Sequence, residues 1–212
     1  RSAHPAVLEA LMKSSGESYG GYGLDFWCEK AAEEIGKYIG TAEADIHFLV
    51  GGTQANFTVI TAALRSYQSV ISADTGHIQG HETGAVENTG HKIIALPSAD
   101  GKITAAQVRE QAELYLDSGI KEHITQPKMV YLSFPTEFGT VYSKAELEEI
   151  SGVCRRYGLF LFIDGARLGY GLGAAEADVT MEDIARLADV FYCGGTKCGA
   201  LFGEAVGIIN PV

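Results

Sequence analysis

Positive charge is scarce in this sequence of 212 residues. Lysine and arginine number 16 against 27 aspartates and glutamates, which gives a formal net charge of −11. No run of lysine or arginine follows a helix or a loop, and proteins that bind phosphate backbones or anionic membrane surfaces depend on such clusters. The composition therefore argues against nucleic acid and membranes as partners.

Long apolar stretches are also missing. No segment approaches the roughly 18 consecutive apolar residues that span a bilayer, and the first five residues lack the apolar core of a secretory signal. We therefore expect a soluble, cytoplasmic protein.

Cysteine and histidine do not form metal or disulfide motifs. The four cysteines, Cys28, Cys154, Cys193 and Cys198, include no CxxC pair, so we expect buried thiols rather than a disulfide framework or a zinc site. His77 and His81 have the i, i+4 spacing of a helical metal pair, but HExxH is absent and the surrounding glycines disfavour a helix. We expect no metal site here.

What the sequence does contain is a globular composition, 46% apolar and 20% charged, with 26 glycines that gather at apparent strand ends. Residues 5–15 and 26–39 carry apolar side chains at helical spacing. From Asp45 onward, short apolar runs alternate with longer amphipathic ones, which is typical of βα units around a mostly parallel sheet. We predict strands near 46–50, 69–73, 92–96, 128–134, 159–163, 189–193 and 205–209, and helices over 53–67, 104–118, 143–157 and 180–187.

These elements predict an α/β fold, a three-layer α/β/α sandwich with a mostly parallel seven-stranded sheet. An N-terminal helical segment, residues 1–44, would precede a larger domain, residues 45–212. Ser143 followed by Glu146 is a capping box for one of the helices. Such a sheet should bind its ligand at the carboxyl ends of its strands.

The first candidate motif joins a strand to a helix. The strand ending at Val50 leads into Gly51-Gly52-Thr53-Gln54-Ala55-Asn56, so the N–H groups of Gly52, Thr53 and Gln54 would face outward at a helix amino end and form a phosphate cradle. The motif lacks the GxGxxG pattern and a Walker lysine, so dinucleotide and P-loop functions are disfavoured. A plain glycine turn into a helix is the alternative.

Two further motifs place charges at strand ends. The apolar run of residues 159–163 ends in Asp164-Gly165-Ala166-Arg167, where the charges serve a ligand, pair with each other or cap a turn. Residues 189–193 lead into Gly194-Gly195-Thr196-Lys197, and a desolvated lysine amine can act as a nucleophile towards carbonyl carbon. An anion cradle, a carboxylate and such a lysine at one sheet edge are the parts that a pyridoxal 5′-phosphate enzyme needs.

The segments GGTQAN, GHIQGHETG, FIDGARLGYG and CGGTKCG, in this order, resemble the threonine aldolase and β-eliminating lyase family of fold-type-I pyridoxal-phosphate enzymes. The resemblance implies that Lys197 carries the cofactor, that Asp164 pairs with its pyridine nitrogen and that His77 stacks on its ring. It further implies that Gly52 and Thr53 hold the phosphate, that Ala166 packs near the other ring face and that Arg167 holds the phenolic oxygen or a substrate carboxylate. Thr196 would add a hydroxyl.

The sequence departs from this family at one site position. The family's threonine aldolases usually carry a histidine where this chain has Thr136-Glu137. Glu137 would act as an alternative base or only contact a loop. The reaction implied is the cleavage of a β-hydroxy-α-amino acid to glycine and an aldehyde. A β-eliminating lyase, a transaminase or a non-catalytic self-associating module are the alternatives.

The resemblance also concerns size and assembly. Members of the family continue into a small carboxy-terminal domain, so we expect a fragment in which residues 45–212 form the cofactor-binding large domain. Fold-type-I enzymes place their sites between subunits, which implies a homodimer or homotetramer, with an amino acid as the small-molecule substrate.

Overall fold

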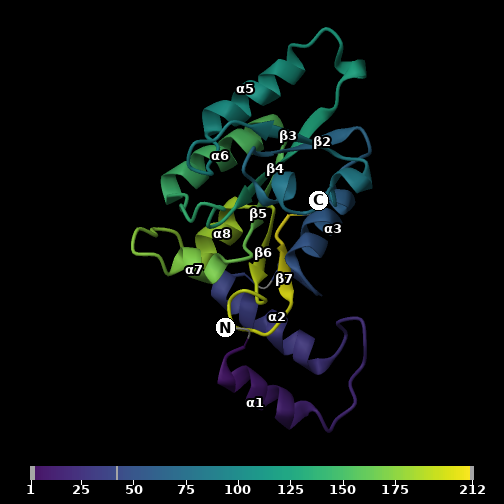
Figure 1. The fold of residues 1–212 in the computed structure, drawn as a ribbon, viewed down its shortest axis with the longest axis vertical. Coiled ribbons are helices and arrows are strands. Elements are labelled where there is room, and N and C mark those ends of the chain that lie inside the picture. Colours follow the sequence, from purple (N-terminus) through teal and green to yellow (C-terminus); the bar gives the residue numbers. More distant parts are fainter. Residues whose placement is uncertain (1–2, 42, 211–212) are drawn as a thin grey trace.

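Seven strands form one sheet in a computed structural model, which describes residues 3–41 and 43–210 (Figure 1). Its order is β1-β7-β6-β5-β4-β2-β3, and β7 alone runs against its neighbours while the others are parallel to one another. The strands are β1 (Asp45–Leu49), β2 (Gln68–Ala73), β3 (Lys92–Leu96), β4 (Gln126–Ser133), β5 (Phe160–Asp164), β6 (Val190–Gly194) and β7 (Glu204–Ile208). Each predicted strand is confirmed within two residues, and the predicted fold class is confirmed.

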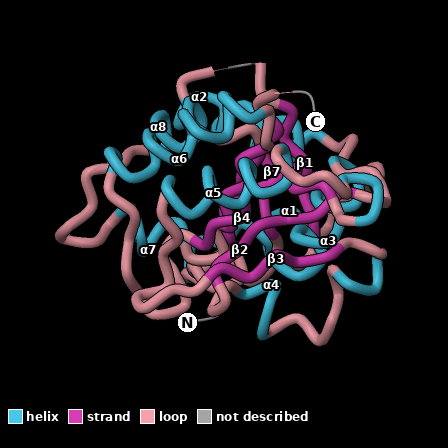
Figure 2. The backbone as a smooth tube through the Cα atoms, turned by 90° about the horizontal axis from the view of Figure 1, so that it is seen from above, coloured by secondary structure: helices cyan, strands magenta, loops and turns pink. Residues whose placement is uncertain are grey.

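Helices cover both faces of the sheet, as the view in Figure 2 shows. One core cluster joins one sheet face to α2 (Phe26–Ile39), α5 (Ala105–Leu116), α6 (Lys144–Tyr157) and α8 (Met181–Leu187). A second cluster joins the opposite face to α3 (Gly52–Ala63) and α4 (His77–Gly80). Along β4, Val130 and Leu132 belong to the first cluster, and Met129 and Tyr131 to the second. This alternation is the period of two that a sheet buried on both faces requires.

Helix starts follow their capping chemistry. The predicted box at α6 forms, because the Ser143 hydroxyl accepts the N–H of Glu146 and the Glu146 carboxylate accepts the N–H of Ser143. Equivalent boxes begin α5 at Thr104 and α8 at Thr180. Each box satisfies N–H groups that have no partner in the first helical turn.

Three details differ from the predicted helices. α3 ends at Ala63 instead of Tyr67, because Leu64 is extended and Gln68 turns back to bond Arg65. Two short helices, α4 and α7 (Leu168–Leu172), form in glycine-rich segments that showed no helical period. Two single 3₁₀ turns, Glu87–Thr89 and Lys121–His123, were also not predicted.

The amino-terminal segment is only loosely covered. No side chain of α1 (Pro5–Ser14) is buried, whereas Ile39 at the end of α2 joins the core. The division into domains 1–44 and 45–212 therefore stays a prediction. Residues 1–2 of the first domain and 211–212 of the second lie outside the described residues. Within residues 3–41 and 43–210, no helix has the length and hydrophobicity needed to cross a membrane.

The cysteines are all free thiols. Cys154 is buried, but Cys28, Cys193 and Cys198 are half-buried, so the prediction of four buried thiols is wrong for three of them. Of the half-buried thiols, Cys193 lies in β6 and Cys198 in the turn that follows it.

Candidate functional site

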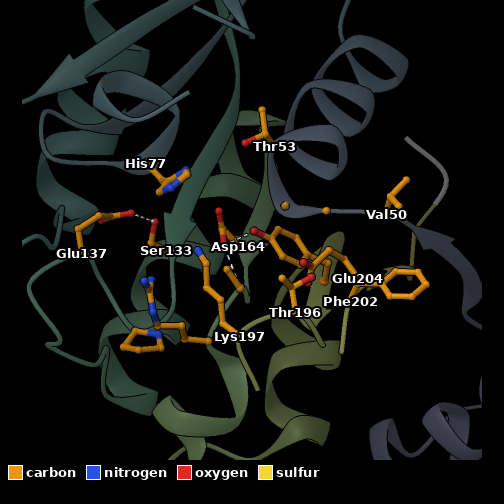
Figure 3. Close-up of a pocket in the computed structure, with 16 residues that line it drawn as sticks. Val50, Thr53, His77, Ser133, Glu137, Asp164, Thr196, Lys197, Phe202 and Glu204 are labelled. Atoms are coloured by element: carbon orange, nitrogen blue, oxygen red, sulfur yellow. Dashed lines mark hydrogen bonds between the residues drawn. The ribbon is translucent and has the colours of Figure 1, made fainter. Parts of the chain in front are cut away.

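A cavity of about 220 Å³ opens at the carboxyl edge of the parallel strands (Figure 3). Because parallel strands end at one edge, residues far apart in sequence meet there. Nine of the ten predicted site residues line it: Gly52, Thr53, His77, Glu137, Asp164, Ala166, Arg167, Thr196 and Lys197. Gln54 does not; its side-chain oxygen instead accepts the Val50 N–H at 3.0 Å and closes the turn before α3.

Asp164 ends β5 as a carboxylate that is only 4% exposed. Its Oδ1 accepts the Tyr192 hydroxyl at 2.5 Å and the Ala166 N–H at 2.9 Å, and its Oδ2 accepts the Tyr131 hydroxyl and the Asn56 amide, the latter at 3.1 Å. These four bonds compensate the desolvation of the carboxylate.

The alternative in which Asp164 pairs with Arg167 is not what the structure shows. The partners of Asp164 are two phenols, an amide and a backbone N–H, and among the described residues no ion pair joins it to the exposed Arg167. Burial raises the pKa of Tyr131 and of Tyr192 well above the usual value of tyrosine. Both phenols therefore remain neutral O–H donors to Asp164 at ordinary pH.

The amino end of α3 forms the wall of the cavity nearest β1. Gly51 caps the helix in an extended conformation and Gly52 is its first residue, so the first N–H groups of α3 have no carbonyl one turn earlier to bond. A Cβ on Gly52 would lie 3.0 Å from the Tyr192 hydroxyl oxygen, so this position favours glycine. Free N–H groups at a helix amino end are the kind of group that can bind an anion, so the anion cradle stays a prediction.

Lys197 lies in a closed turn between β6 and β7. Gly195 donates its N–H to the Gly203 carbonyl at 2.9 Å, and Gly203 donates to the Thr196 hydroxyl at 3.1 Å. The lysine side chain is exposed and points towards Asp164 and Ser133 in Figure 3. The turn therefore presents the amine to the cavity instead of burying it in the core.

Close backbone contact brings the Asp164 and Lys197 segments together. Gly194 donates its N–H to the Gly165 carbonyl at 2.9 Å. A Cβ on Gly165 would lie 1.9 Å from the Tyr192 carbonyl oxygen, and one on Gly194 would lie 2.3 Å from the Ala166 carbonyl oxygen. Only glycine at both positions lets the ends of β5 and β6 approach this closely.

His77 begins α4 and faces the cavity with a half-buried side chain. Its Nδ1 lies 2.8 Å from Oε1 of the buried Glu82, and its ring stacks on that of His81 with centroids 5.6 Å apart. The hydrogen bond to Glu82 raises the pKa of His77 above its ordinary value, although burial opposes the shift. The His77 ring offers a ligand an aromatic face, and its cationic form is favoured by Glu82.

Glu137 reaches the cavity from the loop after β4. Its Oε1 accepts the Ser133 hydroxyl at 2.6 Å, and Oε2 is buried without a hydrogen-bond partner among the described residues. An unpartnered carboxylate oxygen in a cavity wall is poised to accept a proton or a hydrogen bond from a ligand. Glu137 therefore contacts the cavity itself and not only a loop.

Glu204 is a second buried carboxyl in the wall, beside Thr196. Its Oε2 accepts the Gly195 N–H at 3.2 Å, and burial raises the pKa of Glu204 above its usual value. Glu204 could not be recognised from the sequence, because its signal is only a glutamate at the start of an apolar strand.

Sequence reasoning also missed the residues that surround Asp164. Tyr131 and Tyr192 lie on the strands either side of β5 and share its cavity-facing side. Strand alternation carries this signal, since Ser133 pairs with Asp164 and Tyr131 lies two residues earlier. Asn56 and Glu82 lie in the quoted segments GGTQAN and GHIQGHETG, but nothing in those segments shows that they meet.

The profile of the β-eliminating lyase family matches residues 5–207 of this chain. The chain belongs to this family. A threonine aldolase structure from Leishmania major shares 46% identity and superposes with a TM-score of 0.93, over 98% of this chain and 60% of that one. Two curated relatives, from Pseudomonas sp. and Pseudomonas aeruginosa, are 35% and 33% identical over 97% of this chain, and both are described as low specificity L-threonine aldolases. The chain spans 59% of the length of each.

Proposed function

We propose that the protein of which this chain is part is a pyridoxal-phosphate-dependent lyase that cleaves a β-hydroxy-α-amino acid to glycine and an aldehyde. One observation carries the proposal: the α3 amino end, the buried Asp164 and Lys197 line a single cavity. The descriptions of the Pseudomonas relatives as low specificity L-threonine aldolases support the choice of reaction.

The residues of the cavity fit pyridoxal phosphate. Free N–H groups at Gly52 and Thr53 suit a phosphate. Because Gly52 lies close to the Tyr192 hydroxyl, a side chain at this position would crowd the space in front of these N–H groups. Asp164 supplies a carboxylate for the pyridine nitrogen, His77 a flat wall for the ring and Lys197 the amine to which the cofactor attaches. Once bound, the cofactor supplies an electron sink for a bond broken at the amino acid Cα.

A ring N–H can reach Asp164 only by displacing one of its four present donors. The Tyr131 hydroxyl has a second polar neighbour, because the Ser133 hydroxyl donates to it at 3.4 Å. A shift of the Tyr131 side chain away from Asp164 Oδ2 would leave that hydroxyl with a hydrogen-bonding partner and give Oδ2 room for a ring N–H.

Glu137 is proposed as the base that acts on the substrate side chain. Its Oε2 has no hydrogen-bond partner within residues 3–41 and 43–210, and the Ser133 hydroxyl donates to the other oxygen. In cleavage between Cα and Cβ, the β-hydroxyl must lose its proton as the aldehyde forms, and Glu137 Oε2 takes that proton. Arg167 is exposed at the cavity edge, where its guanidinium suits a substrate carboxylate or the phenolic oxygen of the cofactor.

We further propose a homodimer or homotetramer in the cytoplasm. Exposed apolar side chains on and between α1 and α2 support self-association: Met12, Tyr22, Leu24, Trp27 and Tyr38. The scarcity of basic residues supports a small-molecule substrate and not a nucleic acid.

Product analysis of the full-length protein tests the reaction. With L-threonine and pyridoxal phosphate, we expect glycine and acetaldehyde in equal amounts, and none with Lys197→Ala. A 2-keto acid with ammonia would favour β-elimination, and a new amino acid from an added keto acid would favour transamination. A well-folded protein that has no turnover, and in which Lys197→Ala changes neither colour nor ligand binding, would favour the non-catalytic module.

A further inference from the structure

Glu82 is a buried carboxylate to which the proposed reaction gives no task. It is 6% exposed and follows α4, one turn from His77. Its Oε1 accepts the Asn56 amide at 2.6 Å and lies 2.8 Å from His77 Nδ1. Its Oε2 has no hydrogen-bond partner in the part of the chain that the structure describes. A buried carboxylate without compensating partners costs free energy. The groups that donate hydrogen bonds to Glu82 must therefore stabilise its charge.

The donors and acceptors around Glu82 fix one arrangement. A carboxylate oxygen only accepts, so His77 must carry its proton on Nδ1. The Asn56 nitrogen faces both Glu82 Oε1 and, at 3.1 Å, Asp164 Oδ2, so each of its two N–H bonds goes to a different carboxylate. The Asn56 oxygen is left without a partner among the described residues, which agrees with this orientation of the amide.

We propose that Glu82 is a positioning residue that holds the His77 ring with Nδ1 protonated, and that Asn56 ties this pair to Asp164. The cavity wall and the cavity floor are then one hydrogen-bonded unit, His77–Glu82–Asn56–Asp164, assembled from α4, α3 and β5. The identity of the ligand that stacks on His77 rests on the proposed function. The hydrogen bonds among these four residues do not depend on it.

Groups of both charges face the His77 ring from several elements: Glu82 after α4, the stacked His81, Asp164 on β5, Glu137 after β4 and Lys197 after β6. The hydrogen bond to Glu82 is the largest influence and raises the pKa of His77, Asp164 adds to it, and burial and Lys197 oppose it. The imidazolium ion therefore persists to higher pH than in a free histidine. Glu82 thus favours the cationic form of the ring on which a ligand would stack.

The protonation of His77 can be observed directly in the full-length protein. Long-range ¹H–¹⁵N spectra of ¹⁵N-histidine-labelled protein report both the titration midpoint and the tautomer of each ring. The His77 signals are identified by their loss in His77→Gln. Spectra recorded without and with pyridoxal phosphate, and in the absence of any substrate, keep this test separate from catalysis.

We expect the wild-type His77 to carry its proton on Nδ1 above its midpoint. Glu82→Gln removes the charge but keeps an acceptor oxygen, so the midpoint should fall towards the ordinary value while the Nδ1–H tautomer stays. Glu82→Leu removes the acceptor as well, so the tautomer preference should also be lost. The matched control is Glu87→Gln, which alters an exposed carboxylate of the same segment and should leave both quantities unchanged.

The role of Asn56 is tested by coupling. Asp164→Asn should lower the His77 titration midpoint when Asn56 is present, and should lower it less in an Asn56→Leu background. If Asp164 acted on His77 only through space, the change in midpoint would be the same in both backgrounds. An Nε2–H tautomer in the wild type would overturn the proposal even if every variant failed to fold. An unchanged midpoint in Glu82→Gln, or an undiminished effect of Asp164→Asn without Asn56, would overturn it too. Absence of lyase activity would contradict only the proposed function.

Discussion

At the scale of single residues, Glu137 decides whether this site can do without the family's usual histidine. If its free oxygen accepts the substrate proton, Glu137→Gln should lower kcat for threonine cleavage by about 10²–10⁴-fold, the usual contribution of a general base. KM and pyridoxal phosphate binding should change little, because the amide keeps the bond from Ser133. Steady-state kinetics of the full-length protein measure this. The exposed Glu149 is a control, since Glu149→Gln should have wild-type kinetics.

Glu204 leads to a prediction about pH. Burial raises the pKa of Glu204, so the unfolded chain gives up this proton more readily than the folded one. The stability present below the ordinary value of 4.5 is therefore lost as the pH rises through the raised pKa. Glu204→Gln keeps an oxygen for the Gly195 N–H, so we expect a higher melting temperature than wild type at pH 7 and no gain at pH 4. A lower melting temperature at pH 7 would contradict this.

The sequence predicted the positions of residues in the fold where a motif stood at a strand end. Asp164, Lys197 and Gly52 follow or precede apolar runs, so their place at the sheet edge followed from the βα pattern alone. Asn56 is different, because its partners Glu82 and Asp164 lie 26 and 108 residues away in the chain. Such contacts depend on how α3 and α4 pack against the sheet, and no spacing in the sequence encodes them.

At the scale of elements, the contact between the ends of β5 and β6 sets the geometry of the cavity. Gly165→Ala would place a methyl group 1.9 Å from the Tyr192 carbonyl oxygen, and a backbone atom cannot move aside as a side chain can. We expect a loss of about 3 kcal/mol in the free energy of unfolding. Gly152 on the exposed face of α6 has open space around it, so Gly152→Ala should stabilise by about 0.5–1 kcal/mol. Urea unfolding of both variants measures the contrast, and equal effects would show that the close contact is unimportant.

Element prediction was accurate where periodicity was long and failed where glycine obscured it. The 14 residues of α6 present a complete amphipathic pattern with a capping box, and α6 begins within one residue of its predicted start. The four residues of α4 and the five of α7 are too short for a helical period to show. Both short helices carry cavity residues or follow them directly, so the least predictable elements shape the site.

At the scale of the whole molecule, the two core clusters on either side of the sheet hold the cavity edge in place. The order of the strands could not be read from the sequence, because several arrangements of βα units bury the same apolar faces.

A ligand that binds only the folded state should raise the stability of the entire protein. We expect pyridoxal phosphate at 100 times its Kd to add about 2.7 kcal/mol. Thermal unfolding measures this, and pyridoxal, which lacks the phosphate for the α3 amino end, should stabilise less at equal concentration. Equal stabilisation by the two would contradict the anion cradle.

The most direct test of the account is the absorption spectrum of the full-length protein with pyridoxal phosphate, followed by borohydride reduction and peptide mapping. We predict a visible band that reduction abolishes, with the reduced cofactor found on Lys197 and on no other lysine. Absence of the band, or a label spread over surface lysines, would contradict the claim that this cavity holds pyridoxal phosphate.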